Sequence, residues 1–156
     1  MFLILLGPDG AGKTTLAKRL AKSNKAMYIK RDQPKNDDDR RNMVDSYLRI
    51  APGLNNVIYD RYIYCELVYG PIIRNEHIIS DEDIQRIEDM LLRKGAIIIH
   101  CTDTLDNLWE RCTRRGEDYV TDKETLGKIR QGYYDVLSKT KLPVLEYKIG
   151  TSMFGM

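Results

Sequence analysis

The fold is decided by residues 2–20, which read FLILLGPDGAGKTTLAKRL. Five apolar residues, Phe2–Leu6, run straight into a glycine-rich turn, and the next stretch places Leu16 and Leu20 on one helical face. The turn, Gly7–Thr14, matches G-x-x-x-x-G-K-[ST] at every fixed position. A strand before this motif and a helix after it is the context in which the motif cradles phosphate. The stretch therefore predicts a phosphate-binding loop for a nucleoside triphosphate.

The loop motif predicts a role for most of its residues. Its glycines let backbone N–H groups converge on phosphate oxygens, and the following helix adds its dipole. We expect Lys13 to reach the β- and γ-phosphates of ATP, and the Thr14 hydroxyl to bind Mg2+. The expected ATP-binding residues of the loop are Gly7, Gly10, Ala11, Gly12, Lys13, Thr14 and Thr15.

One loop residue does not fit a phosphate cradle. Asp9 carries a negative charge into a turn that should be short of it. An aspartate can stabilise its own turn by bonding to nearby backbone groups, so a purely local role is one alternative. A role toward a second substrate is the other.

Apolar runs and helical patterns alternate along the rest of the chain. Three of the runs are almost unbroken, which suits a sheet covered on both faces. The alternation predicts an α/β fold of three layers: a five-stranded parallel sheet with helices on both faces. The expected strands are 2–6, 26–30, 56–60, 96–101 and 143–149, and the expected helical stretches include 13–23, 37–50 and 105–112. Ser80 with Asp83, and Thr121 with Glu124, predict two more helix starts as capping boxes.

Composition narrows the class further. The chain has 156 residues, which fits a single domain over residues 1–156. Its formal net charge of +2 gives no argument for nucleic acid as a partner. Three cysteines and two histidines lack metal-ligand spacing, so no zinc site is expected. We see no leader peptide and no apolar run of membrane-spanning length, and therefore expect a cytoplasmic protein with no membrane partner.

A second motif follows the third expected strand. Residues 57–62 read VIYDRY, so Asp60 and Arg61 stand at the carboxyl edge of the sheet, where open α/β sheets bind ligands. Asp60 is suited to Mg2+, and Arg61 can clamp a second phosphate with two hydrogen bonds. The alternative is a structural ion pair at a strand end.

The phosphate loop alone does not name the reaction. The chain has no N-K-x-D guanine signature, no D-x-x-G after the third strand and no Gly-Gly pair. These absences disfavour a GTPase and a shikimate-type kinase. They leave other small-molecule kinases open.

The two motifs together resemble the thymidylate kinase family. The resemblance rests on G-x-D-G-x-G-K-T-T at 7–15 and on Asp60-Arg61-Tyr62, and residues 60–70 are also similar to a segment of compact phage-type nucleotide kinases. It implies transfer of the ATP γ-phosphate to a deoxynucleoside monophosphate such as dTMP, with Asp9 accepting a hydrogen bond from the 3′-hydroxyl of the acceptor. It further implies a homodimer, and the host cytoplasm if the chain is viral.

Arg31 follows the second expected strand in YIKRDQP. Members of the family often carry Arg-Glu-Pro-Gly nearby, and the resemblance implies that Arg31 contacts the acceptor phosphate. The related deoxynucleoside kinases place a catalytic carboxylate near this strand end, and Asp32 could take that role. Loop charges in solvent are the alternative for both residues.

The arginine segment WERCTRRGEDY, residues 109–119, falls where the family has its mobile lid. The resemblance implies a short lid that turns around Gly116. Arg111, Arg114 and Arg115 can share one helical face, and we expect them to neutralise charge on the transferring phosphoryl group. A solvated basic face is the alternative.

Four functions remain open on the sequence. A monophosphate acceptor is already anionic and needs no strong base, whereas a nucleoside hydroxyl needs a base such as Asp32 or Asp60. A polynucleotide 5′-kinase and an ATP-binding protein without activity complete the set. Base recognition is expected within residues 35–80, where Tyr47, Tyr62, Tyr64 and Tyr69 are either stacking residues or core.

Overall fold

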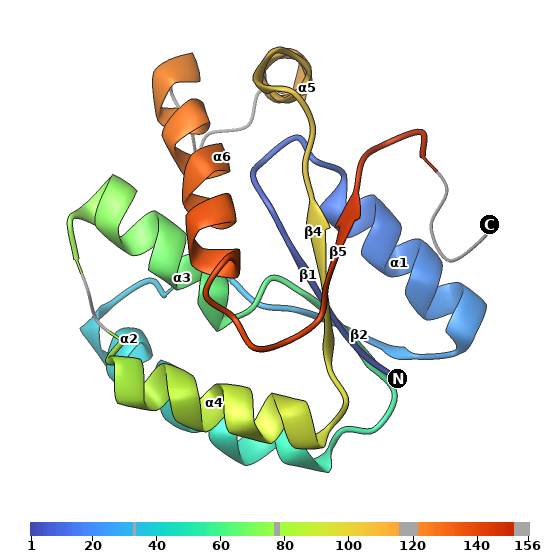
Figure 1. The fold of residues 1–156 in the computed structure, drawn as a ribbon, viewed down its shortest axis with the longest axis vertical. Helices are drawn as coiled ribbons and strands as arrows, with labels where there is room; N and C mark the ends of the chain where they lie inside the picture. The colour runs from blue at the N-terminus through green and yellow to red at the C-terminus, as the bar shows by residue number, and fades with distance from the viewer. Residues whose placement is uncertain (33, 77–78, 116–121, 152–156) are drawn as a thin grey trace.

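Five parallel strands form one sheet in the order β2-β3-β1-β4-β5 (Figure 1). The structure is a computed structural model that describes residues 1–32, 34–76, 79–115 and 122–151. The strands are β1 (Phe2–Leu6), β2 (Met27–Lys30), β3 (Val57–Asp60), β4 (Ile97–Cys101) and β5 (Val144–Tyr147). The prediction of a five-stranded parallel sheet is therefore confirmed, with each strand after the first shorter than expected by one to three residues.

The centre of the sheet is the first strand of the chain. Ile4 stands opposite Tyr59 of β3 and Ile98 of β4, and every residue of β1 is buried. The edge strands are different, since Met27 of β2 and Leu145 of β5 are exposed. This explains the sequence pattern: the near-continuous apolar runs belong to the three central strands, which are covered on both faces.

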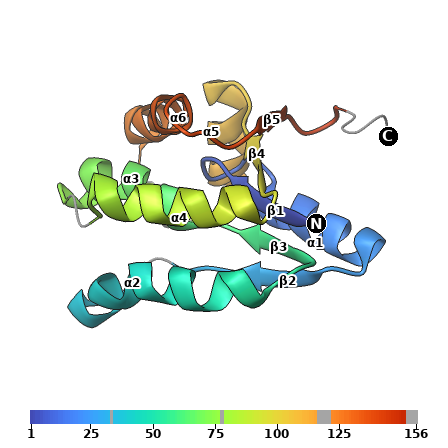
Figure 2. The ribbon, with the colours of Figure 1, turned by 60° about the horizontal axis from the view of Figure 1, so that its bottom comes forward.

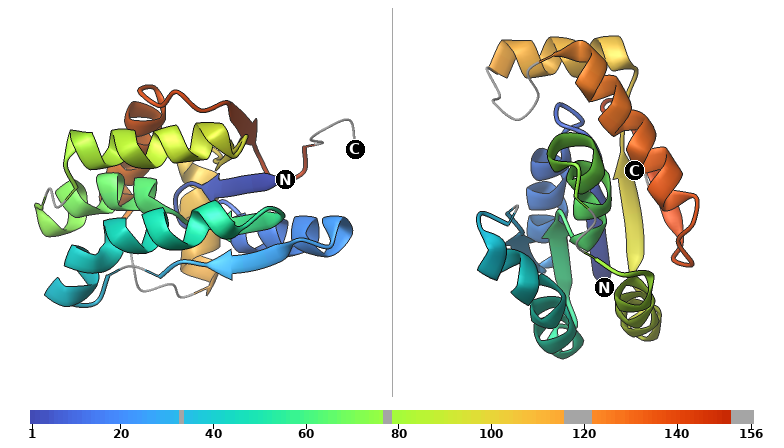
Figure 3. Two further views of the ribbon diagram at one scale, coloured as in Figure 1. Left: turned by 90° about the horizontal axis from the view of Figure 1, so that it is seen from below. Right: turned by 90° about the vertical axis from the view of Figure 1, so that its left-hand side faces the viewer.

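Helices cover both faces of this sheet. Figure 1 shows α1 on one side of the strands and α3, α4 and α6 on the other, and Figures 2 and 3 show the same layers from other directions. The helices are α1 (Lys13–Asn24), α2 (Asp37–Ile50), α3 (Ile63–Tyr69), α4 (Asp81–Arg93), α5 (Leu105–Arg115) and α6 (Lys123–Leu137). Two short segments complete the set, a 3-10 turn at Ala51–Gly53 and a π-helical turn at Gly70–Arg74.

Helix α3 has no counterpart among the elements expected from the sequence. Six of its seven residues are buried, so its sequence, IYCELVY, lacks the one-sided apolar stripe by which a surface helix is recognised. It matters for function because it begins directly after the Asp60-Arg61 pair and continues into the π-helical turn.

One of the two helix starts predicted from capping boxes is confirmed. Ser80 is the N-cap of α4, and its hydroxyl accepts from the backbone N–H of Asp83 at 3.1 Å. The other prediction was off by one residue. The N-cap of α6 is Asp122, whose carboxylate accepts from the backbone N–H of Thr125 at 2.7 Å, while Thr121 lies outside the described residues. Aspartate is a more favourable N-cap than threonine, which explains why Asp122 takes this position.

A metal-binding cluster and a membrane-spanning helix are both absent from the described part of the chain. Cys65, Cys101 and Cys112 are free and buried, and no group of three or more His, Cys, Asp or Glu side chains in the described part could hold a metal ion. Among the same residues, no helix is both long and apolar enough to span a bilayer.

Candidate functional site

The loop between β1 and α1 keeps the shape that its glycines predict. Gly7, Gly10 and Gly12 all have positive φ, and Gly12 is the N-cap of α1. At Gly7 a side chain is impossible, because its Cβ would lie 1.9 Å from the carbonyl oxygen of Cys101. The end of β4 therefore presses directly on the start of the loop, and only glycine fits there.

Lys13 lies inside the loop rather than above it. Its Nζ donates to the carbonyl oxygens of Gly7 at 2.6 Å and Pro8 at 3.0 Å. Burial, and next the charge of Arg61, lower the pKa of Lys13 from its ordinary value. A buried ammonium in contact with the loop is positioned to exchange carbonyl partners for phosphate oxygens.

The two residues expected to bind Mg2+ are side by side. Thr14 Oγ1 donates to Asp60 Oδ2 at 2.6 Å, and the hydroxyl of Tyr28 donates to the same oxygen at 2.7 Å. The second oxygen of Asp60 is buried and has no hydrogen-bond partner among the described residues. A hydroxyl beside a carboxylate with an unpartnered oxygen is a donor set that fits Mg2+, because this ion takes oxygen ligands. Sequence reasoning missed Tyr28.

Asp9 and Arg61 are also brought together. Arg61 Nη2 lies 3.1 Å from Asp9 Oδ1, and the side chain of Asp9 is only 3% exposed. The other carboxylate oxygen of Asp9 is buried without a hydrogen-bond partner in the described structure. Arg61 has φ of +73°, a conformation that is uncommon for a non-glycine residue and frequent at functional sites. The local-turn alternative for Asp9 accounts for neither the ion pair nor the buried oxygen.

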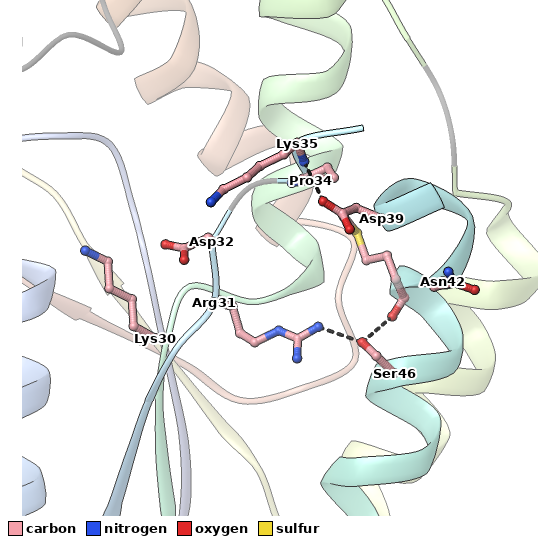
Figure 4. Close-up of a pocket in the computed structure, with 9 residues that line it drawn as sticks. Lys30, Arg31, Asp32, Pro34, Lys35, Asp39, Asn42 and Ser46 are labelled. Carbon is pink, nitrogen blue, oxygen red and sulfur yellow. Dashed lines mark hydrogen bonds between the residues drawn. The ribbon is translucent and has the colours of Figure 1, made fainter. Parts of the chain in front are cut away.

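Three adjoining cavities follow the carboxyl edge of the sheet. The loop cavity, of about 110 Å³, is lined by Asp9, Gly10, Gly12, Lys13, Thr14, Thr15, Lys30, Arg61 and Arg115. The α2 cavity, of about 430 Å³, is lined by Lys30, Arg31, Asp32, Pro34, Lys35, Asp39, Asn42, Met43 and Ser46 (Figure 4). A small cavity of about 20 Å³ shares Arg61 with the first and Arg31 with the second. The site is thus a groove from the phosphate loop to α2.

Arg31 lies in the part of the groove away from the loop. Its Nη2 donates to Ser46 Oγ at 2.6 Å (Figure 4). Its guanidinium also stacks 4.3 Å from the centre of the Tyr47 ring. Asp32 lines the same α2 cavity and is exposed. Both residues flank the groove at the end of β2, whereas Arg61 stands between the loop cavity and the small cavity.

The three lid arginines point to different places. Arg115 lines the loop cavity. Arg114 pairs with Glu110 at 2.5 Å on an exposed face, where 69% of its side chain is accessible. Arg111 donates to the carbonyl oxygen of Gly10 at 3.1 Å and to Asp103 Oδ2 at 2.6 Å. All three lie within α5, as their spacing predicted, but Arg111 and Arg114 have different partners. The turn around Gly116 lies outside the described residues.

The four candidate tyrosines are all buried, and only two reach the groove. Tyr47 and Tyr62 line the small cavity. Tyr64 instead donates to Glu88 Oε1 at 2.8 Å, and the ring of Tyr69 packs edge-on against Tyr133. The small cavity also contains Glu66 of α3, which is ion-paired with Arg74 and which the sequence analysis did not single out.

Comparison with known proteins supports the same class of fold. No family model matches the chain. The SPbeta prophage-derived uncharacterized protein YorR of Bacillus subtilis is 27% identical over 152 residues, which cover 95% of this chain and 88% of YorR. The crystal structure of YorR in complex with phosphorylated GDP has a TM-score of 0.82 at 24% identity and covers 97% of this chain and 87% of that one.

Two kinases share the architecture at lower identity. The deoxyadenosine kinase of M. mycoides with bound dATP has a TM-score of 0.69 at 16% identity and covers 98% of this chain and 93% of its own. Polyphosphate kinase 2 of Arthrobacter aurescens has a TM-score of 0.65 at 17% identity, and the chain spans 59% of its length. The fold is that of P-loop kinases.

Proposed function

We propose that the protein is an ATP-dependent kinase of deoxynucleoside monophosphates. It would move the γ-phosphate of ATP to an acceptor such as dTMP and release the two diphosphates. The observation that carries this proposal is the contact of Asp9 with Arg61, which joins the phosphate loop to the groove beside it. A loop that served only a triphosphate would not need a buried carboxylate.

On the donor side, the loop from Gly7 to Thr15 holds the triphosphate. Backbone N–H groups and Lys13 supply positive charge, and Thr14 and Asp60 would hold the ion. Bound Mg2+ neutralises charge on the β- and γ-phosphates. Phosphoryl transfer asks chiefly for position and charge neutralisation, and both are provided by this buried, preformed loop.

On the acceptor side, Arg61 lines both the loop cavity and the small cavity beside it, and we assign it the acceptor phosphate. Arg31 is the second candidate for that phosphate. The unpartnered oxygen of Asp9 is free to accept a hydrogen bond from the sugar 3′-hydroxyl. We place the base in the α2 cavity, of about 430 Å³, which adjoins the small cavity that Tyr47 and Tyr62 line.

At the lid, Arg115 lines the loop cavity and is the arginine we assign to the transferring phosphoryl group. Arg111 and Arg114 remain candidates for the same role. A guanidinium there stabilises charge as it spreads over the equatorial oxygens of the transition state.

A deoxynucleoside kinase is the second candidate, and the position of Asp32 in the groove favours it. Deprotonation of a 5′-hydroxyl needs a base. Asp60 is poorly placed for that task, because one of its oxygens already accepts from Thr14 and Tyr28. Asp32 is exposed in the groove and would be the base.

A coupled assay of ATP consumption decides between the two. The screen offers each deoxynucleoside monophosphate, the matching nucleosides and, because YorR was solved with phosphorylated GDP, guanine nucleotides. We expect turnover with a monophosphate and none with its nucleoside. Turnover of nucleosides alone would replace the proposal with the second candidate. Lys13→Ala is the control, since loss of its ammonium should abolish transfer in either case.

A further inference from the structure

Arg111 of the arginine segment bonds to the phosphate loop itself. Its guanidinium donates through Nη1 to the carbonyl oxygen of Gly10 at 3.1 Å and through Nη2 to Asp103 Oδ2 at 2.6 Å. One planar cation thus links the loop to the turn between β4 and α5.

The side chain of Asp103 is buried and is held by several hydrogen bonds and ion pairs. Its carboxylate is 1% exposed and accepts from the backbone N–H of Thr104 at 2.7 Å and from Asn107 Nδ2 at 3.0 Å. Lys148 Nζ lies 3.5 Å from it, and Arg130 Nε donates to its carbonyl oxygen at 2.7 Å. Helix α5 and the residues after β5 therefore reach the buried carboxylate of Asp103, while α6 bonds to the backbone carbonyl oxygen of the same residue.

Asp103 stays ionised throughout the working range of pH. Burial raises the pKa of Asp103, but the hydrogen bonds from Asn107 and Arg111 outweigh it and bring the pKa to about 2. The partner of Arg111 is therefore a permanent negative charge.

The other end of the link fixes a single peptide plane of the loop. Its carbonyl, from Gly10, accepts from Arg111, and its N–H, from Ala11, donates to the Pro8 carbonyl oxygen at 3.3 Å. Because the peptide unit is planar, holding both ends fixes its orientation. Helix α5 also touches the loop here, since a Cβ on Gly10 would lie 2.7 Å from the Leu108 carbonyl oxygen.

We infer that Asp103 is a positioning residue of the phosphate loop: it orients Arg111, and Arg111 clamps the Gly10–Ala11 peptide so that the following amides meet the phosphates. The clamp acts on the donor phosphates alone. It depends on the proposed function only in that the loop binds phosphate, and not on which acceptor is used.

The clamp predicts a loss of affinity that is independent of base and sugar. Asp103→Asn keeps the size of the side chain and its bond to Thr104, but removes the charge that orients Arg111. We expect dissociation constants for ADP with Mg2+ and for inorganic tripolyphosphate, measured by calorimetry, to rise by the same factor, about tenfold. Arg111→Gln should give the same loss, and the double variant should be no worse than either single variant.

Asp106→Asn is the matched control. Asp106 lies in the first turn of α5, is exposed and is paired with Lys123. Within the described residues, no hydrogen bond or ion pair joins it to the phosphate loop. It should bind both ligands as the unaltered chain does. Asp103→Glu, which keeps the charge, should recover part of the loss.

A second measurement keeps the inference testable whatever the protein binds. Hydrogen exchange at the Ala11 amide, followed by NMR, should speed up in Asp103→Asn and in Arg111→Gln but not in Asp106→Asn. Unchanged exchange, additive losses in the double variant, or a loss confined to ADP would each overturn the clamp. If the unaltered chain bound neither ADP nor tripolyphosphate, the proposed function would be wrong. The hydrogen-exchange experiment would still test the clamp.

Discussion

At the scale of single residues, Asp9 is the informative member of the phosphate loop. Most of its neighbours in the motif are expected to act on a triphosphate, whereas Asp9 pairs with Arg61 and keeps one buried oxygen without a partner in the described structure. A buried unpartnered carboxylate oxygen costs free energy, about 1–3 kcal/mol or more. Such a cost is offset when a substrate supplies the missing hydroxyl.

Asp9→Asn is therefore expected to reduce discrimination by the sugar. The unaltered enzyme should prefer a deoxynucleotide to its 2′,3′-dideoxy analogue, and the variant should lose about tenfold of that preference in kcat/KM. The KM for ATP should change little. An unchanged preference would remove Asp9 from the acceptor site.

Arg61→Ala tests the other half of the pair. If Arg61 binds the acceptor phosphate, the KM for the acceptor should rise by about two orders of magnitude, since charge-assisted pairs to phosphate are strong. The KM for ATP should rise far less. Arg86→Ala, an exposed arginine of α4, is the control and should leave both values unchanged. An effect on ATP alone would refute the assignment.

Tyr28 is a residue that only the structure reveals as part of the site. Tyr28→Phe removes one of the two hydroxyls that orient the Asp60 carboxylate. We expect the Mg2+ concentration for half-maximal activity to rise by about tenfold, the scale of effects from groups that orient metal ligands. Tyr134→Phe, at an exposed hydrogen bond to Glu146, should not shift it.

At the scale of elements, α5 serves the phosphate loop as well as the lid. Its Leu108 and Cys112 approach Gly10 so closely that a Cβ there would lie 2.7 Å from one and 3.2 Å from the other. Helix α5 and the loop are therefore closely packed, and we expect a change in α5 to alter the loop.

Gly10→Ala measures that packing against a matched glycine. Gly95 also has positive φ, at +68° against +82° for Gly10, but a Cβ at Gly95 meets nothing within 4 Å. Gly95→Ala should therefore cost only backbone strain, about 1 kcal/mol of unfolding free energy in urea. Gly10→Ala should cost at least about 1 kcal/mol more and should weaken ATP binding. An equal loss of unfolding free energy in the two variants would show that α5 can shift to accommodate the added methyl group.

At the scale of the whole molecule, the buried histidine of β4 sets a pH limit on stability. Burial, with smaller contributions from the charges of Arg130 and Lys13, lowers the pKa of His100 to about 4. The unfolded chain binds this proton near pH 6.5, so between these values it holds more protons than the native state. The free energy of unfolding should therefore fall as pH drops from about 6.5 toward 4. In His100→Gln, the free energy of unfolding from urea titrations should depend less on pH over this range.

Much of the fold follows from local pattern. The strands, the main helices and the phosphate loop each have a sequence signature that depends on near neighbours. The strand order does not, because it depends on contacts between distant segments. The same holds for Tyr28 with Asp60 and for Asp103 with Arg111 and Gly10. The arginines of α5 have the expected helical spacing, but their partners, Glu110 for Arg114 and Asp103 for Arg111, could not be predicted from it.

The strand order has a consequence for synthesis of the chain. The central strand, β1, leaves the ribosome first, but its partners are Val57–Asp60 and Ile97–Cys101. Nascent chains that end before β4 therefore carry FLILL with one of its two edges unpaired. Such exposed apolar strands attract chaperones and aggregate. Both edges of β1 can be paired only when about two thirds of the polypeptide has been made, and β5 is added later still. The loop that follows β1 packs against Cys101 of β4, so it reaches its final form only after that point.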